Sequence, residues 1–257
     1  MKKILFILMI IQSTFILPGQ VKIIAHRGAS YLAPENTIAS ARLAWKSGAD
    51  AVECDIWLSK DNKIMCSHDV DTKRTTGQDY KINETDSKVL RKLDAGSFKD
   101  EKYRGEKLPY LKDLIKTVPP GKELVIEIKC KSEVIPLLKK EIDRHQNKRN
   151  FTFISFDLQT ICDTKKAFPD NPCYWLCNSA ALLETNFDKV QESNLQGVSL
   201  AYSIIYESVM KKAEGLHLEV YSWTVDDPAE AERLIDLGVK GITTNRPGWL
   251  NKQIINY

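Results

Sequence analysis

The chain has 257 residues, of which 43% are hydrophobic and 28% are charged, as in a globular protein with enough residues for one sizeable core. A formal net charge of +3, with no dense cluster of lysine and arginine, argues against a nucleic-acid-binding protein. This length is compatible with one large α/β domain or with two smaller domains.

Residues 1–20 differ from the rest of the chain. Two lysines precede an apolar run at residues 4–11, which is the arrangement of a secretory signal peptide. The run is shorter than the roughly 20 residues that a membrane-spanning helix needs. We therefore expect export to the periplasm or out of the cell, and no stable membrane insertion once a mature chain of residues 21–257 is released. An uncleaved anchor helix is the alternative.

Apolar, β-branched-rich runs alternate with helix-like segments along the mature chain. This alternation predicts a parallel sheet with helices outside it. The predicted strands are 21–26, 51–58, 63–67, 123–129, 150–155, 172–176, 196–200, 217–223 and 239–243. The predicted helices are 36–47, 110–118, 132–146, 158–167, 180–193, 204–214 and 228–237.

The second and third predicted strands are joined by only four residues, 59–62. Parallel neighbours need a crossover of about a dozen residues, so these two strands must form an antiparallel hairpin. Removing 63–67 leaves eight strands in series with helices between them, which is the count of a (β/α)8 TIM-type barrel. We expect a single catalytic barrel domain over 21–257.

The hairpin also predicts a register. If Lys60 and Asp61 form a two-residue turn, Glu53 pairs with His68 across the two strands. Asp55 then lies on the same face, two residues along. A slip of one residue would separate these side chains.

Residues 70–108 follow the hairpin and carry no strong periodicity apart from a short helix near 86–92. Long loops in compact domains tend to be functional. We expect a small insertion over the mouth of the barrel.

The six cysteines all lie in the mature chain. Export would permit disulfides, and the sequence does not fix a pairing. Cys54 and Cys130 flank charged strand-end residues, which favours buried free thiols on the opposite face. Cys173 and Cys177 have metal-ligand spacing, but no nearby histidine or second cysteine pair supports zinc.

Polar and aromatic side chains stand at the carboxyl ends of several predicted strands, where (β/α)8 barrels carry their active sites. Clustered carboxylates are hard oxygen ligands for Ca²⁺ or Mg²⁺, and without a cation they would repel one another. The strand-end residues are His26, Glu53, Asp55, Glu127, Lys129, Ser155 and Trp223.

Two histidines, His26 and His68, can act as general acid and base near neutral pH. Arg27 and Lys129 can neutralise a phosphate. Each signal has a simpler interpretation: a core histidine, a solvated strand edge, a salt-bridged strand end or, for Asn36, a helix cap. Their joint placement at strand ends favours a site.

These motifs together resemble the glycerophosphodiester phosphodiesterase family, from about residue 22 to residue 247. The matching motifs are His26-Arg27-Gly28, Glu35-Asn36-Thr37, Gly48-Ala49-Asp50-x-x-Glu53-x-Asp55, His68-Asp69, Arg74-Thr75-Thr76-Gly77, Leu108-Pro109-x-Leu111, Glu127-x-Lys129, Ser155-Phe156, Trp223-Thr224-Val225 and Gly238-x-x-Gly241-Ile242-Thr243-Thr244-Asn245-x-Pro247.

The resemblance implies a barrel that hydrolyses small glycerophosphodiesters to glycerol 3-phosphate and an alcohol. It implies one divalent cation, Ca²⁺ or Mg²⁺, as cofactor. It does not predict a protein partner or an oligomeric state. The roles implied by position are an acid–base pair (His26, His68), metal ligands (Glu53, Asp55, Glu127), phosphate ligands (Arg27, Lys129) and substrate walls (Phe156, Trp223). One departure is Asn245, where the family usually has aspartate, so the loss of a charge puts any electrostatic role there in doubt.

Two other functions are compatible with such a barrel. A phospholipase D-like enzyme acting on intact lipids would need an apolar membrane-docking surface, and residues 70–108 are strongly polar. A catalytically dead barrel used as a binding module should have lost a histidine or a carboxylate, and all five are present.

Overall fold

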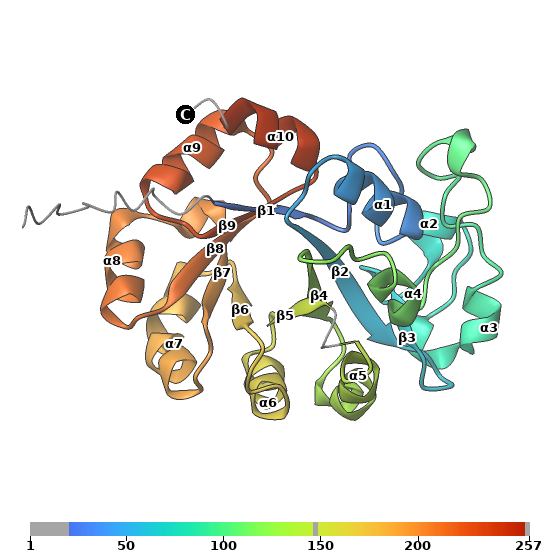
Figure 1. Ribbon diagram of the computed structural model, residues 1–257. Helices are drawn as coiled ribbons and strands as arrows, with labels where there is room; N and C mark the ends of the chain where they lie inside the picture. Colours follow the sequence, from blue (N-terminus) through green and yellow to red (C-terminus); the bar gives the residue numbers. More distant parts are fainter. Residues whose placement is uncertain (1–20, 146–148, 255–257) are drawn as a thin grey trace, which may run out of the picture.

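Eight parallel strands close into a barrel in the computed structural model, which describes residues 21–145 and 149–254 (Figure 1). The first strand pairs with both the second and the last, which completes the ring. The (β/α)8 fold predicted from the sequence is therefore confirmed. The barrel strands are β1 (Lys22–Ala25), β2 (Ala51–Leu58), β4 (Glu123–Ile128), β5 (Asn150–Ser155), β6 (Cys173–Cys177), β7 (Gly197–Ala201), β8 (Glu219–Trp223) and β9 (Gly241–Thr244).

Helices surround the barrel on its outside (Figure 1). They are α1 (Ile38–Lys46), α4 (Leu111–Ile115), α5 (Ile135–Ile142), α6 (Leu158–Ala167), α7 (Ala180–Glu192), α8 (Glu207–Gly215), α9 (Pro228–Asp236) and α10 (Pro247–Ile254). The sequence pattern missed α10, which begins at a proline two residues beyond the end of the last strand; proline suits the first turn of a helix. Among the residues described, no helix is both long and apolar enough to cross a membrane. The predicted signal peptide, residues 1–20, lies outside the described residues.

Each barrel strand is buried on both faces, so its side chains alternate between two cores. The outer core lies between strands and helices and includes Cys54 and Ile56. The barrel interior holds a smaller apolar cluster of Ile24, Ala51, Val125, Ile154, Tyr174, Leu176 and Tyr221. Since alternate residues share a face, Glu53 and Asp55 point toward the barrel interior, away from Cys54. All six cysteines are buried and unpaired in the structure.

The strand β3 (Ile64–Cys66) pairs with β2 in the antiparallel sense, so the predicted hairpin is confirmed. The predicted register is wrong by one residue. Ile56 pairs with Cys66, and continuing this register would set His68 opposite Cys54 rather than Glu53.

The shift comes from the turn. Ser59 N donates a hydrogen bond to Lys63 O (2.9 Å), so the loop holds three residues, not two. Asn62 closes it with a φ of +57°, in the left-handed region that asparagine tolerates better than most residues.

The ladder of β3 ends at Cys66, and Ser67 N then donates to Asp55 O (3.1 Å) before the chain leaves the sheet. His68 is therefore outside the strand, and the strict alternation of faces no longer applies to it. It lines the same cavity as Glu53. Glu53 and His68 therefore line one cavity, as expected. They do so because the chain turns after β3, and not because the two residues pair across the strands.

The insertion between β3 and α4 lies beside the hairpin and α1 (Figure 1). It contains α2 (Lys73–Thr76), α3 (Ser87–Leu90) and two 3₁₀ turns, and α3 falls within the helix predicted near 86–92. Its own apolar cluster consists of Met65, Ile82, Leu90, Leu93, Ala95 and Leu108. This cluster joins the insertion to the hairpin, because Met65 belongs to β3.

Candidate active site

A cavity of about 160 Å³ opens at the carboxyl ends of the barrel strands. Eight of the nine residues predicted for the site line it: His26, Arg27, Glu53, His68, Glu127, Lys129, Phe156 and Trp223. The ninth, Asp55, is only 1% exposed and lies against Arg27 and Lys129. The structure thus brings together residues that are far apart in the sequence.

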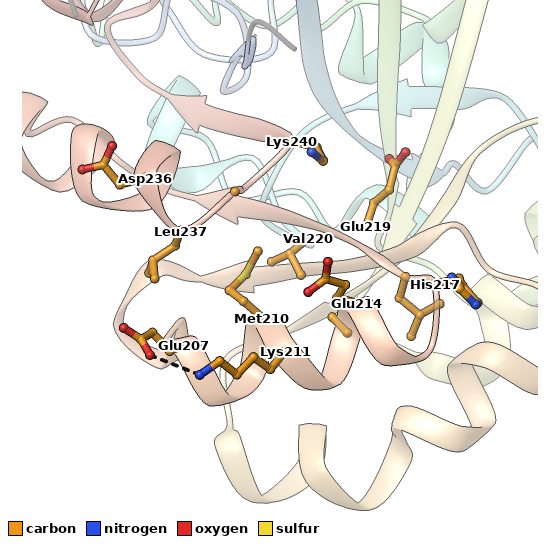
Figure 2. Close-up of a pocket in the computed structure, with 13 residues that line it drawn as sticks. Glu207, Met210, Lys211, Glu214, His217, Glu219, Val220, Asp236, Leu237 and Lys240 are labelled. Carbon is orange, nitrogen blue, oxygen red and sulfur yellow. Dashed lines mark hydrogen bonds and ion pairs between the residues drawn. The ribbon is translucent and has the colours of Figure 1, made fainter. Parts of the chain in front are cut away.

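A larger cavity, about 660 Å³, lies at the other end of the barrel between α8 and α9 (Figure 2). Met210, Val220 and Leu237 line it, with charged side chains around them. One of these pairs locally, Lys211 Nζ with Glu207 Oε2 at 3.5 Å. The cavity lies at the amino ends of β8 and β9, and barrel enzymes carry their chemistry at the opposite ends. The smaller cavity is therefore the candidate active site.

Three buried carboxylates form the floor of this site. Asp55 and Glu127 are paired neighbours on β2 and β4, and Glu53 precedes Asp55 on the same face. One oxygen from each of the three lies within 4.8 Å of the other two. Burial, followed by repulsion from Asp55, raises the pKa of Glu127 to about 7 and that of Glu53 well above its usual range.

This floor fits a divalent cation. Glu53 Oε1 and Asp55 Oδ1 are buried and have no hydrogen-bond partner among the described residues. Buried polar atoms normally have partners, so two unpartnered carboxylate oxygens in one cluster of acids fit a bound cation. Carboxylate oxygens are the ligands that Ca²⁺ and Mg²⁺ prefer.

The loop between β1 and α1 holds the floor in place. Arg27 N donates to Glu53 Oε2 (2.8 Å), and Asn36 Nδ2 donates to Asp55 Oδ2 (2.7 Å). Asn36 Oδ1 also accepts from Asp55 N (3.0 Å), so this side chain bridges the backbone and the carboxylate. The interpretation of Asn36 as the helix cap is wrong: Thr37 caps α1, in a capping box with Ser40.

The same loop needs unusual backbone conformations. Arg27, Gly28 and Asn36 have φ values of +53°, +81° and +55°. A Cβ atom at Gly28 would lie 2.5 Å from Ser40 Oγ, so glycine is required there for space as well as for φ. The tight turn lets the backbone amide of Arg27 reach Glu53.

Two cations face the carboxylates. Lys129 Nζ lies 2.9 Å from Glu127 Oε1 and 3.6 Å from Asp55 Oδ1. Burial by itself would lower the pKa of Lys129, but these two carboxylates raise it. Arg27 Nε lies 3.4 Å from Asp55 Oδ2, and its Nη1 donates to Glu35 (2.9 Å). Both side chains line the cavity as permanent positive charges, which suits a phosphate.

His26 is held by Asn245, whose Oδ1 lies 2.8 Å from His26 Nδ1. Asp226 fixes the orientation of that amide, because Asn245 Nδ2 donates to Asp226 Oδ2 (2.6 Å). The atom facing His26 is therefore the amide oxygen, and His26 Nδ1 must be the donor. Nε2 keeps the lone pair. Burial, and next the charge of Arg27, lowers the pKa of His26 to about 4.

His68 has a charged partner instead. Asp69 Oδ1 lies 2.7 Å from His68 Nδ1, and Arg74 Nε donates to Asp69 Oδ2 (2.6 Å). The Arg74 guanidinium also forks onto both oxygens of Glu35, at 2.8 Å each. Burial would raise the pKa of Glu35, but Arg74 and Arg27 lower it to about 2.

The sequence did not predict a role for several of these supporting residues. Glu35, Asp69 and Arg74 lie within the motifs named above, and Asp226 gave no signal. Asp226 acts through its contacts with Thr244 and Asn245, 18 and 19 residues further along, and acids before a predicted helix are common in any protein.

An aromatic wall stands beside the charged floor. The rings of Phe156 and Trp223 meet edge to face, with centroids 5.3 Å apart at 83°. Trp223 Nε1 donates to Ser199 O (3.0 Å), which fixes the indole. Phe156 is 44% exposed, and Lys129 Nζ lies 5.9 Å from its ring centroid. The cavity thus combines a polar, metal-suited end with an apolar side.

Comparisons with known proteins agree with this arrangement. Residues 26–249 match the sequence profile of the glycerophosphoryl diester phosphodiesterase family. A glycerophosphodiester phosphodiesterase of Caldanaerobacter subterraneus subsp. tengcongensis is 32% identical over 232 residues, covering 88% of this chain and 94% of that protein. A human lysophospholipase D is 26% identical over 277 residues, covering 92% and 87%. An Oleispira antarctica phosphodiesterase, solved in complex with the product sn-glycerol-3-phosphate, superposes with a TM-score of 0.85 at 26% identity, covering 91% and 96%.

Proposed function

Since the chain belongs to the glycerophosphoryl diester phosphodiesterase family and is a phosphodiesterase of that family, we propose that it hydrolyses glycerophosphodiesters to sn-glycerol 3-phosphate and an alcohol. One observation carries the proposal: a single site brings together two histidines, two cations and three buried carboxylates, two of which have an oxygen without a hydrogen-bond partner. The Oleispira antarctica structure, with its bound product, supports the choice of substrate.

The substrate's phosphodiester is bound by charge. Glu53, Asp55 and Glu127 would hold one divalent cation, Ca²⁺ or Mg²⁺, which when bound polarises a phosphoryl oxygen. Arg27 and Lys129 line the same cavity and neutralise the remaining phosphate charge. Phe156 and Trp223 pack against the carbon atoms of the glycerol or of the alcohol.

The two histidines have different hydrogen-bond partners on Nδ1, and each therefore carries out a different proton transfer. His26, with a neutral amide on Nδ1 and a pKa lowered to about 4, is unprotonated at neutral pH and accepts a proton at Nε2. It therefore acts as the base toward the nucleophile, which is water or a glycerol hydroxyl. His68, whose Nδ1 faces the Asp69 carboxylate, is the second imidazole of the cavity and acts as the acid that protonates the leaving alcohol.

Replacing Asn245 by aspartate tests the role of His26. A carboxylate in place of the amide oxygen favours the imidazolium, so the pKa of His26 should rise from about 4. If His26 is the base, the acidic limb of the kcat/KM profile moves to higher pH, and activity below that limb falls. Movement of the alkaline limb instead would make His26 the acid. Ser30→Ala is the control, because Ser30 Oγ donates to the same Asn245 oxygen (2.9 Å) without adding charge.

The substrate assignment predicts release of glycerol 3-phosphate from small deacylated headgroups. Glycerophosphocholine, glycerophosphoethanolamine and glycerophosphoinositol, each offered with Ca²⁺ or Mg²⁺, should yield it in a coupled glycerol 3-phosphate assay. Release from none of them would contradict the proposal and favour a binding module. Release of phosphocholine instead of choline would show cleavage on the wrong side of the phosphate.

We also propose that residues 21–257 act as a single exported catalytic unit after removal of residues 1–20. The proposal is supported by the two lysines and the apolar run at the amino terminus. N-terminal sequencing of the protein from periplasmic or secreted fractions should find a chain beginning near residue 21. A cytoplasmic chain beginning at residue 1 would contradict it.

A further inference from the structure

Most of the exposed large hydrophobic side chains lie at one end of the barrel. In the part of the chain that the structure describes, seven of them lie on segments that leave the carboxyl end of a barrel strand, or in the first turn of the helix that follows, and the other four lie on the insertion after β3. They are Tyr31, Leu32, Val70, Tyr80, Val89, Phe98, Phe156, Leu182, Tyr202, Tyr206 and Trp249. The described loops at the opposite end contribute none. Apolar side chains scattered singly over a surface are ordinary, so a docking surface must come from a patch in which exposed apolar and charged residues lie together.

One part of this end is built from contacting residues of three segments, and we name it the mouth patch: Tyr31, Leu32, Lys99, Arg246 and Trp249. Arg246 stacks between two rings, with its guanidinium carbon 3.9 Å from the centroid of Tyr31 and 4.6 Å from that of Trp249. Lys99 Nζ lies 6.0 Å from the Tyr31 centroid. Tyr31, Leu32 and Trp249 are 52%, 58% and 41% exposed.

The cations of the mouth patch are available to an outside anion. Within the described residues, neither Lys99 nor Arg246 has a carboxylate oxygen within 4.0 Å. Exposed aromatic and leucine side chains interleaved with unpaired cations are the surface chemistry of proteins that lie on an anionic lipid–water interface. The apolar groups enter the headgroup region while the cations meet the lipid phosphates.

The mouth patch borders the active site. Tyr31 N donates to Asn245 O (3.1 Å), and the neighbouring Ser30 donates to the Asn245 oxygen that holds His26. From the sequence, residues 70–108 are expected to lack an apolar docking surface, because they are strongly polar. The structure takes Tyr31, Leu32 and Trp249 from other segments, so the polar insertion does not exclude lipid contact.

We propose that the mouth patch docks the barrel on an anionic lipid surface, with the cavity facing the lipid headgroups. The occupant is the surface of a membrane that carries anionic phospholipid. A consequence, which rests on the proposed function, is that monoacyl glycerophosphodiesters embedded in that surface are substrates alongside the small soluble ones.

Vesicle co-sedimentation of the mature chain, residues 21–257, tests the docking without any need for activity. The protein should pellet with vesicles of phosphatidylcholine and phosphatidylglycerol, less with phosphatidylcholine alone, and less again as salt is raised. Lys99→Glu with Arg246→Glu should weaken binding at least fivefold, since each basic residue near the surface contributes about 1 kcal/mol. Tyr31→Ser with Leu32→Ser should also weaken it.

Matched controls separate the patch from general effects. Lys240→Glu reverses a charge at the opposite end of the barrel, and Leu182→Ser removes an exposed leucine outside the patch. Both should bind vesicles like the unchanged protein. Equal binding by the patch variants and the controls, or no preference for anionic vesicles, would overturn the proposal.

Activity measurements distinguish this proposal from the proposed function. The patch variants should cleave soluble glycerophosphocholine at the unchanged rate, but lysophosphatidylcholine in anionic vesicles more slowly. Anionic vesicle binding that depends on the patch, with no hydrolysis of any substrate, would uphold the docking and contradict the function. Hydrolysis of soluble glycerophosphocholine without vesicle binding would uphold the proposed function and contradict the docking. Thermal melts confirm that the variants remain folded.

Discussion

Replacing His26 by alanine is expected to lower kcat by about 10²-fold or more, and His68→Ala should have an effect of similar size. Each substitution removes one proton transfer and leaves the cations and carboxylates of the cavity in place. Substrate binding should therefore change little, and kcat and kcat/KM should fall together. Because the two histidines serve one reaction, the double variant should be much less impaired than the product of the two single losses.

Initial rates of glycerol 3-phosphate release over a range of glycerophosphocholine concentrations check this expectation. His145→Ala is the matched control, because His145 lies on the outside of the barrel, 3.6 Å from Glu141. It should keep full activity. Turnover near the wild-type level in both active-site variants would remove the acid–base assignment, whereas loss in only one would leave the other without a role.

Removal of divalent cations should abolish activity, and it should also make stability depend on pH in a specific direction. Without a cation, burial and mutual repulsion raise the pKa of Glu127 from 4.5 to about 7. Between these values the native state holds a proton that the unfolded state has released, so the free energy of unfolding falls as pH rises. One pKa unit corresponds to about 1.4 kcal/mol, so the Glu127 carboxyl alone should lower the free energy of unfolding by roughly 3 kcal/mol over this pH range.

A bound cation should reverse this trend, since it stabilises the ionised carboxylates. Adding Ca²⁺ or Mg²⁺ should raise Tm more above pH 7 than below pH 4.5, as measured by differential scanning fluorimetry. The matched variant is Asp55→Asn, which removes one repelling charge. It should be more stable than the wild type when metal-free at neutral pH, insensitive to added cation and inactive. Full activity after exhaustive dialysis against EDTA would exclude the metal from the reaction.

The strands could be predicted well because burial on both faces leaves an apolar signature in the sequence. All nine predicted strands are present, with ends that differ by at most two residues. The strand-end residues could be predicted for a related reason: His26, Glu53, Asp55 and Glu127 interrupt apolar runs, where a charged group needs an explanation. The short link after β2 excluded a crossover, which left eight strands for the barrel.

Details that depend on one residue of register or on a single contact could not be predicted. The turn that ends at Asn62 makes the hairpin loop one residue longer than predicted, and the hydrophobic pattern gives no sign of this. The predicted Glu53–His68 pair was therefore wrong. Asparagine is a residue type that often caps helices. The hydrogen bond from Asn36 to Asp55 depends instead on a left-handed backbone conformation at Asn36, which no sequence pattern predicts.

The sequence by itself determined the barrel, the set of charged groups at its mouth and the family that these motifs resemble. Strand periodicity is local, and the charged groups stand out against apolar neighbours. Only the tertiary structure decided how these groups are used: which atom of Asn245 faces His26, which carboxylate oxygens lack partners, and that Tyr31, Lys99 and Arg246 form one surface. These contacts join segments tens to more than two hundred residues apart, and only closure of the barrel fixes their distances.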